Sequence, residues 1–226
     1  MLYIVATPIG NLKDITLRAI EVLKSVDLIA AEDTRHTQNI TTQYQIATPL
    51  TSYFEHNKVA KGRQLLELLK QGKAVALVSD AGTPGISDPG FHLIRLAIDN
   101  NIPLTIIPGP TAIVAALVLS GFPTHKFVFE GFLPVKKEGR RKLLKKLAAE
   151  ERTIVTYESP HRLLKTLQDM VEVLNDPLIA CIREATKKFE EVRRERASVL
   201  LEHFTKTGPK GELVLVFNPA FSRKRP

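Results

Sequence analysis

Short apolar runs and amphipathic stretches follow one another along the first half of the chain. The apolar runs predict strands at Leu2–Ala6, Leu28–Ala31, Ala74–Ser79 and Leu104–Ile107. The stretches between and after them have helical spacing of apolar residues, at Ile15–Ser25, Lys61–Gln71, Phe91–Asn100 and Ala112–Leu119. Strands that alternate with helices favour a mostly parallel sheet with both faces covered.

The pattern restarts at Gly121-Phe122-Pro123 and becomes less regular. Further strands are expected at Lys126–Phe129, Thr153–Tyr157, Leu178–Arg183 and Glu212–Phe217. Further helices are expected at Gly139–Glu150, His161–Leu174 and Ala197–Thr205. We therefore expect an α/β protein of two α/β domains, residues 1–121 and 122–226.

A long loop between two of these elements is the strongest local signal. Ser79–Gly90 reads SDAGTPGISDPG and follows an apolar strand. Its glycines and prolines exclude regular structure, and its length exceeds the roughly 2–6 residues that such a connection needs. Loops at the carboxyl ends of strands in α/β sheets are where ligands bind. The loop therefore predicts a ligand site, with Asp80, Thr83, Ser87 and Asp88 as its polar side chains.

Composition narrows the class of protein. No apolar run in the 226 residues is long enough to cross a bilayer, and no leader pattern is present, so we expect a cytoplasmic protein. The single cysteine, Cys181, lies in an apolar run and is interpreted as a core residue. No GxGxxG follows the first strand, no GxSxG occurs, and the histidines lack zinc-ligand spacing. We expect no metal site.

The net charge of +8 suggests a polyanionic partner. A first basic cluster is a candidate phosphate-contacting surface and comprises Lys136, Lys137, Arg140, Arg141, Lys142, Lys145 and Lys146. The tail Arg223–Arg225 could add to this surface. A second cluster is interleaved with glutamates and is interpreted as a solvated, partly self-neutralised face: it comprises Lys187, Lys188, Arg193, Arg194 and Arg196.

Seven motifs in order along the chain carry a family resemblance. They are TPIGNLKDIT from Thr7, AEDTRHT from Ala31, SDAGTPGISDPG from Ser79, PGPTA from Pro108, FEGFLP from Phe129, YESPHRL from Tyr157 and REATKKFEE from Arg183. Together they resemble the tetrapyrrole-methylase-like superfamily of methyltransferases that use S-adenosyl-L-methionine. AEDTR with the glycine loop is similar to the branch that methylates a cytidine ribose 2′-hydroxyl in small-subunit (16S) ribosomal RNA.

The resemblance implies a cofactor held in the cleft between two α/β domains, and a homodimer. It implies cofactor contacts from Ile9, Asp80, Gly82, Thr83, Ile86, Ser87, Thr111, Ala112, Tyr157 and Ala185. Asn11, Arg35, Arg162, Lys136, Lys137, Arg140 and Arg141 are expected to contact the 16S ribosomal RNA or the small ribosomal subunit. Many relatives continue past the last strand, which would leave more of the RNA binding here to the first basic cluster.

A ribose hydroxyl needs a proton acceptor nearby to become a good nucleophile. Asp33, Glu32, His161 and Glu184 are candidates, and the sequence does not choose among them. Each has a structural alternative, as a helix cap for Asp33, an ion-pair partner for the glutamates and a helix-terminal residue for His161. Arg35 and Arg162 could bind RNA phosphate or pair with those carboxylates.

Two other functions remain open at this point. A methyltransferase of the same superfamily could act on a corrin or porphyrin precursor, whose acidic groups also suit a basic protein. A non-catalytic RNA-binding assembly factor could have kept the fold. AEDTR and the first basic cluster favour RNA over the tetrapyrrole, and the intact glycine loop favours a working cofactor site.

Overall fold

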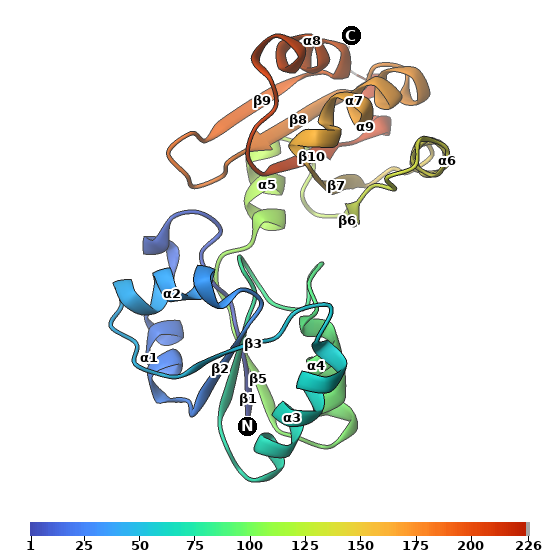
Figure 1. Ribbon diagram of the computed structural model, residues 1–226. Coiled ribbons are helices and arrows are strands. Elements are labelled where there is room, and N and C mark those ends of the chain that lie inside the picture. The colour runs from blue at the N-terminus through green and yellow to red at the C-terminus, as the bar shows by residue number, and fades with distance from the viewer. Residues whose placement is uncertain (225–226) are drawn as a thin grey trace. The chain divides into compact units, whose positions relative to one another are not determined.

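The computed structural model describes residues 1–224, with side chains as far as Phe221, and divides into two compact units, residues 1–111 and 112–226. Figure 1 shows the elements of each unit. The sequence pattern predicts that the first domain ends at Gly121. The division falls earlier because the helix α5 (Ala112–Ser120) packs on the second sheet, where Ala116 and Leu117 join its core.

The first unit is a parallel sheet covered by helices. Five strands pair in the order β3-β2-β4-β1-β5, all parallel. The strands are β1 (Leu2–Val5), β2 (Leu28–Ala31), β3 (Leu50–Ser52), β4 (Val75–Val78) and β5 (Leu104–Ile107). The helices are α1 (Leu17–Ser25), α2 (Thr34–Gln43), α3 (Lys58–Lys70) and α4 (Gly90–Asp99). The predicted parallel sheet is confirmed.

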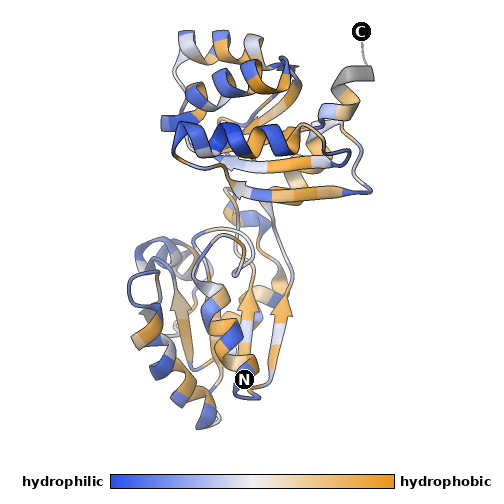
Figure 2. Cartoon of the chain, turned by 90° about the vertical axis from the view of Figure 1, so that its right-hand side faces the viewer, coloured by the Kyte–Doolittle hydropathy of each residue, from blue (hydrophilic) through white to orange (hydrophobic). Residues whose placement is uncertain are grey.

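Alternate residues of these strands fill two cores, one on each face of the sheet. Val5, Ala76 and Val78 pack with residues of α1 and α2, whereas Leu2, Val75 and Leu77 pack with residues of α3 and α4. This alternation follows from the two-residue period of a strand. Figure 2 shows hydrophobic strands and helices that carry both kinds of residue.

The second unit is built on a mixed sheet. Its order is β6-β7-β10-β8-β9, with β6 parallel to β7 and the other pairs antiparallel. The strands are β6 (Phe127–Phe132), β7 (Thr153–Glu158), β8 (Leu178–Arg183), β9 (Glu191–Arg196) and β10 (Leu213–Phe217). The helices after α5 are α6 (Lys137–Leu147), α7 (Pro160–Leu174), α8 (Ala197–Thr207) and α9 (Pro219–Lys224).

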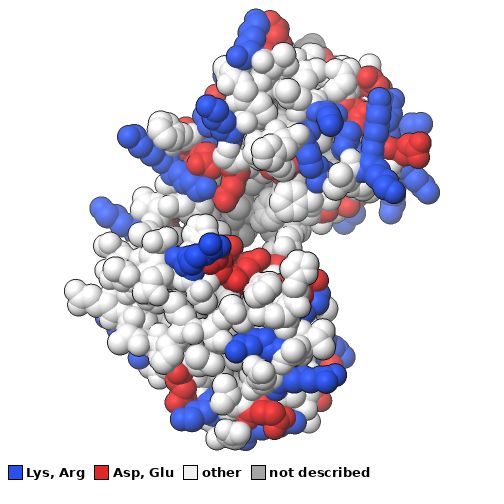
Figure 3. All heavy atoms as spheres, in the orientation of Figure 1, with Lys and Arg blue, Asp and Glu red and all other residues white. Residues whose placement is uncertain are grey.

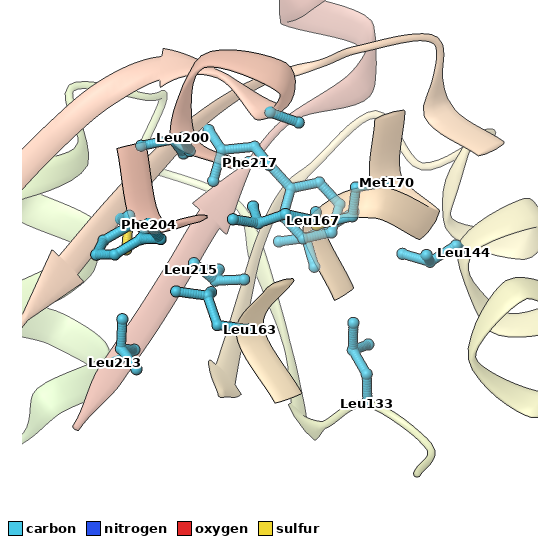
Figure 4. Packing of buried hydrophobic residues seen from close by; sticks show 14 of the residues in the cluster. Leu133, Leu144, Leu163, Leu167, Met170, Leu200, Phe204, Leu213, Leu215 and Phe217 are labelled. Carbon is cyan, nitrogen blue, oxygen red and sulfur yellow. The ribbon is translucent and has the colours of Figure 1, made fainter. Parts of the chain in front are cut away.

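The largest core of the second unit lies between this sheet and α6, α7 and α8. Leucines of α7 meet β10 side chains there, as Leu163, Leu167 and Phe217 show in Figure 4. Cys181 is 1 % exposed in the same core, and burial raises the pKa of its thiol to about 12. The interpretation of Cys181 as a core residue is therefore confirmed.

Four of these elements were absent from the sequence prediction: α2, β3, β9 and the short helix α9. Helix α2 is polar, buries Thr37, Ile40 and Thr41, and begins where the Asp33 side chain accepts the Arg35 N–H. Strand β3 spans three residues at an edge. Strand β9 reads EVRRER, and its charges mask the strand because an edge strand has little need of apolar residues. Over residues 1–224, none of the helices is long and apolar enough to cross a membrane.

Candidate functional site

The carboxyl ends of the parallel strands bring the first group of expected site residues to one edge of the first sheet. Ile9 and Asn11 follow β1, Glu32 and Asp33 follow β2, and Ser79–Gly90 follows β4. Thr111 follows β5. Because all these strands run parallel, the sheet topology itself collects the loops that carry the motifs.

The loop after β4 is tied to the end of β1. Thr7 and Gly82 exchange two backbone hydrogen bonds, of 2.9 and 3.0 Å, and the Thr7 hydroxyl donates to the Ser79 carbonyl. Gly82 has φ +76°, a conformation that side chains rarely adopt. A Cβ on Gly82 would lie 3.6 Å from Ile9 Cγ2 and 3.7 Å from the Pro110 carbonyl oxygen. Gly82 therefore sits where three loops converge.

The carboxylate of Asp88 organises the rest of the loop. It accepts the N–H of Gly85 at 2.9 Å, of Ile86 at 3.2 Å and of Gly90 at 2.7 Å. Gly85 has φ +94° and Ser87 has φ +65°, so this segment is held in a conformation that an untethered chain avoids. Asp88 was noted only as a polar side chain of the loop. The signal for its role was its place just before a helix, where carboxylates accept amide N–H groups.

The remaining expected cofactor residues of the first unit differ in exposure. Ile9 is buried, and Thr83 and Thr111 are half-buried. Asp80, Ile86 and Ser87 are exposed. An isoleucine exposed on a loop of fixed shape, as Ile86 is, fits a contact residue better than a core residue.

Two carboxylates bridge the loops after β2 and β4. The Asp33 N–H donates to Asp80 Oδ1 at 2.9 Å, and the Asp80 N–H donates to Glu32 Oε2 at 3.3 Å. Burial raises the pKa of Glu32, and the nearby carboxylates of Asp80, Asp88 and Asp33 reinforce the rise. By contrast, hydrogen bonds from the Arg35 guanidinium and N–H hold the pKa of Asp33 at about 2.

The charge of this edge indicates the kind of ligand it suits. Four carboxylates lie on the loops after β2 and β4, those of Glu32, Asp33, Asp80 and Asp88, and residues 79–90 contain no Lys or Arg. Arg35, a cation on the helix that follows β2, is paired with Asp33. Such an edge repels phosphate and favours a ligand with positive charge. The converging backbone at Gly82 can approach that ligand closely.

In the second unit, Tyr157 lies among aromatic rings near the end of β7. Its ring centroid is 5.0 Å from that of Phe129 and 5.6 Å from that of Phe132. Phe132 is half exposed. Ala112 begins α5, and Ala185 packs against the core beside that helix.

Arg162 is engaged within its own unit. Its Nε lies 3.5 Å from Glu158 Oε1, and its guanidinium donates to the Leu133 carbonyl. Glu158 is buried, and accepts the Thr166 hydroxyl at 2.5 Å and the Ser159 N–H at 2.7 Å. Of the two possibilities for Arg162, the geometry favours pairing with a carboxylate over binding of phosphate.

Glu184 and His161 are placed differently from Glu32. Glu184 accepts the Glu212 N–H at 2.8 Å and pairs with Lys187 at 3.0 Å, and these contacts lower its pKa despite partial burial. His161 is exposed in the first turn of α7. Both occupy the structural alternatives considered for them.

The first basic cluster divides between surface and interior. Lys136, Lys137, Lys142, Lys145 and Lys146 are exposed on or beside α6, and Figure 3 shows blue side chains gathered there, at the right. Arg140 is 3 % exposed and pairs with Asp169 of α7 at 2.6 Å. The expectation that Arg140 contacts RNA is therefore corrected, because its charge holds α6 against α7. Arg141 also pairs with Asp169 and Glu172.

The second basic cluster is largely self-neutralised, as expected. Arg193 pairs with Glu195 and Glu191, and Lys187 pairs with Glu184 and Glu212. Arg194 and Arg196 donate to backbone carbonyls. The tail side chains Arg223–Arg225 lie outside the part of the chain whose side chains are described. Within the described part, no group of three or more His, Cys, Asp or Glu residues could hold a metal ion.

A parallel α/β unit with a glycine-rich acidic loop, followed by a second α/β unit on a mixed sheet, defines a two-unit α/β protein suited to a cationic small ligand. The family model for tetrapyrrole (corrin/porphyrin) methylases matches residues 1–200. The chain belongs to this family.

Three relatives named ribosomal RNA small subunit methyltransferase I align with nearly the whole chain. The one from Synechocystis sp. is 51 % identical over all of this chain and 81 % of its own length. That of Thermotoga maritima is 49 % identical, covering 96 % of this chain and 97 % of its own length. That of Escherichia coli O157:H7 is 48 % identical, covering 95 % and 76 %.

Solved structures of more distant proteins share the fold. A uroporphyrin-III-C-methyltransferase from Thermus thermophilus matches with a TM-score of 0.69 at 20 % identity, over 97 % of this chain and 95 % of its own. A diphthine synthase matches with a TM-score of 0.72 at 14 % identity, over 96 % and 89 %. At these identities the likeness concerns the fold alone.

The Arg140–Asp169 pair yields a test of the second unit. Arg140→Ala leaves Asp169 buried with its charge poorly compensated, and we expect a loss of about 3–5 kcal/mol in the free energy of unfolding. Urea unfolding followed by circular dichroism measures it. Lys142→Ala, on the exposed side of the same helix, should change stability by less than about 0.5 kcal/mol. Equal effects of the two changes would contradict the assignment.

Proposed function

We propose that this protein transfers a methyl group from S-adenosyl-L-methionine to 16S ribosomal RNA of the small subunit, at the 2′-hydroxyl of a cytidine ribose. The observation that carries the proposal is the 48–51 % identity, over 95–100 % of the chain, to relatives named ribosomal RNA small subunit methyltransferase I. The exposed lysines of α6 supply a surface for an RNA partner.

The residues of the first unit fit S-adenosyl-L-methionine. When bound, this cofactor supplies a methyl group activated by a positively charged sulfonium. The carboxylates around the loop after β4 suit that charge, and Ile9 and Gly82 offer an apolar side chain and close backbone approach. Asp80, Thr83, Ile86, Ser87 and Thr111 of this unit remain proposed contacts, as do Ala112, Tyr157 and Ala185 of the second unit.

Glu32 is the best placed of the candidate proton acceptors. Its carboxylate has a raised pKa and is free of a cation in the described structure. Asp33 is held by Arg35, and Glu184 is held by Lys187. In the reaction the ribose 2′-oxygen would bond to the methyl carbon as the bond from that carbon to the sulfonium sulfur breaks, with S-adenosylhomocysteine as the leaving group, and Glu32 would accept the hydroxyl proton. A positioned base of this kind contributes about 10²- to 10⁴-fold to a rate.

Lys136 and Lys137 are proposed to contact RNA phosphate, together with other exposed lysines of α6. Asn11, which caps the turn at Leu12–Asp14, and the exposed Arg35 remain proposed RNA contacts. Arg141 and Arg162 are less suited to this role than Arg35: all three pair with carboxylates, but the Arg35 side chain is 90 % exposed whereas those of Arg141 and Arg162 are mostly buried. We infer a cytoplasmic protein, which an RNA substrate of this kind supports.

We further infer a homodimer. Val114 and Val118 lie one turn apart on α5 and are 50 % and 67 % exposed, which supports an apolar contact surface. Sedimentation velocity of the protein at micromolar concentration tests this inference. A species of one chain mass at all concentrations would exclude it.

Transfer of labelled methyl tests the proposed function. The acceptors are small ribosomal subunits from cells that lack the modification, protein-free 16S RNA and a corrin precursor. We expect label in ribosomal RNA, with resistance to alkaline cleavage at one cytidine. Label in the corrin precursor would support the tetrapyrrole alternative, and binding of the cofactor without transfer to any acceptor would support an assembly factor.

Asp88→Ala tests the loop. The substitution leaves three backbone N–H groups without their shared acceptor, so the loop loses its shape. We expect the dissociation constant of S-adenosylhomocysteine, measured by calorimetry, to rise about 10- to 100-fold, the equivalent of one or two charged hydrogen bonds. Asp99→Ala removes an exposed carboxylate on α4 and should leave binding unchanged. Unchanged binding in Asp88→Ala would refute the assigned role.

Glu32→Gln tests the proton acceptor. The amide keeps an oxygen for the Asp80 N–H but cannot take a proton, so kcat should fall about 10²- to 10⁴-fold with cofactor binding retained. The raised pKa of Glu32 has a second consequence. In the wild-type protein, kcat/KM should decline as the pH falls through a value above that of an ordinary glutamate, about 4.3, and this decline should vanish in the variant. Glu21→Gln, at an exposed position of α1, is the matched control.

A further inference from the structure

The hairpin between β8 and β9 ends in a tip, residues 184–190, that its own hydrogen bonds hold in one shape. The Lys187 N–H donates to the Glu184 carbonyl at 3.0 Å, and the Glu190 N–H donates to the Lys187 carbonyl at 3.1 Å. The Glu190 carboxylate accepts the Thr186 N–H at 2.6 Å. Glu184 and Thr186 both have positive φ, at 51° and 65°, a costly conformation that such contacts must maintain.

The tip is also fastened to the loop that precedes β10. The Glu184 and Glu212 backbones are joined by a 2.9 Å hydrogen bond, and Glu184 Oε1 accepts the Glu212 N–H. Lys187 Nζ lies 3.0 Å from the carboxylates of both Glu184 and Glu212. The tip is therefore a rigid platform, and Glu184 and Glu212 neutralise the charge of Lys187.

Three residues of the tip are exposed, Lys188, Phe189 and Glu190, and the Glu190 carboxylate already accepts the Thr186 N–H. Phe189 is 64 % exposed, and Lys188 Nζ lies 5.6 Å from the centroid of its ring. Lys210, in the loop fastened to the tip, is exposed as well. Among the described side chains, neither Lys188 nor Lys210 forms an ion pair, and Figure 3 shows blue side chains near this hairpin, at the left.

We propose that this tip is a stacking platform for single-stranded ribosomal RNA: an unpaired base stacks on Phe189 while Lys188 and Lys210 contact the adjoining phosphates. The inference rests on the proposed function and deepens it. An exposed aromatic ring beside Lys188, with Lys210 on the loop fastened to the tip, has the two elements that single-stranded RNA binding requires, a face for a base and charge for the backbone. The lysines also disfavour an uncharged apolar partner, which would have to desolvate them.

Four variants separate stacking, charge and structure. Phe189→Ala removes the ring, Phe189→Trp keeps a stacking face, and Lys188→Ala removes a charge. Val199→Ala, a similarly exposed apolar residue on α8 of the same unit, is the matched control. The readouts are the KM for small ribosomal subunits, the affinity for S-adenosylhomocysteine by calorimetry, and the binding of a short fluorescein-labelled single-stranded RNA by anisotropy.

We expect Phe189→Ala to weaken RNA binding and to raise the KM for subunits about 5- to 100-fold, with cofactor affinity unchanged. Phe189→Trp should retain wild-type values, and Lys188→Ala should lower the slope of log affinity against log salt concentration by about one. Unchanged RNA binding in Phe189→Ala, or an equal loss in Val199→Ala, would overturn the platform.

The anisotropy measurement does not depend on catalysis. A wild-type protein that binds RNA through Phe189 but transfers no methyl group would refute the proposed function and leave the platform standing. Normal methyl transfer by Phe189→Ala, with unaltered KM, would refute the platform and leave the proposed function standing.

Discussion

The carboxylate of Asp88 is the contact on which the first unit's site depends. Three backbone N–H groups from Gly85, Ile86 and Gly90 converge on it, and they hold the loop after β4 in a shape that its positive φ angles would otherwise disfavour. The exchange of hydrogen bonds between Thr7 and Gly82 anchors the other end of the loop to β1. The parallel sheet therefore anchors the loop after β4, and the Asp88 carboxylate maintains its conformation.

The distribution of charged side chains matters for ligand binding as much as the shape of this loop does. The carboxylates on the loops after β2 and β4 would attract a cationic cofactor. The exposed side of α6 and the tip of the β8–β9 hairpin instead carry lysines, which suit phosphate. The buried Arg140–Asp169 pair holds α6 in place and so determines which of its basic residues remain at the surface. A positive net charge alone does not distinguish these roles, because Arg140 and Lys142 lie two residues apart on α6, yet the first is buried and paired and the second is exposed.

Much of the architecture could be predicted from hydrophobic patterning. The strands Leu28–Ala31 and Leu104–Ile107 were identified to the residue because both are short apolar runs, although only the first is mostly buried and the second is an edge strand in which Ile107 alone is buried. Helix α2 and strand β9 were absent from the prediction, since one is polar and the other is charged and lies at an edge. The family could be identified from its motifs. The role of Arg140 could not, because its partner Asp169 lies far along the chain. The roles of Asp88 and Arg162 were not predicted either, although the N–H groups that Asp88 binds and the carboxylate of Glu158 beside Arg162 lie within four residues of them.

Hydrogen exchange of the loop Ser79–Gly90, followed by mass spectrometry with and without S-adenosylhomocysteine, tests the central claim most directly. We expect the amides of Gly85, Ile86 and Gly90 to exchange slowly in the free protein, because Asp88 already binds them, and more slowly still with the ligand. Rapid exchange in the free protein that the ligand leaves unchanged would contradict both the preformed loop and its role in binding.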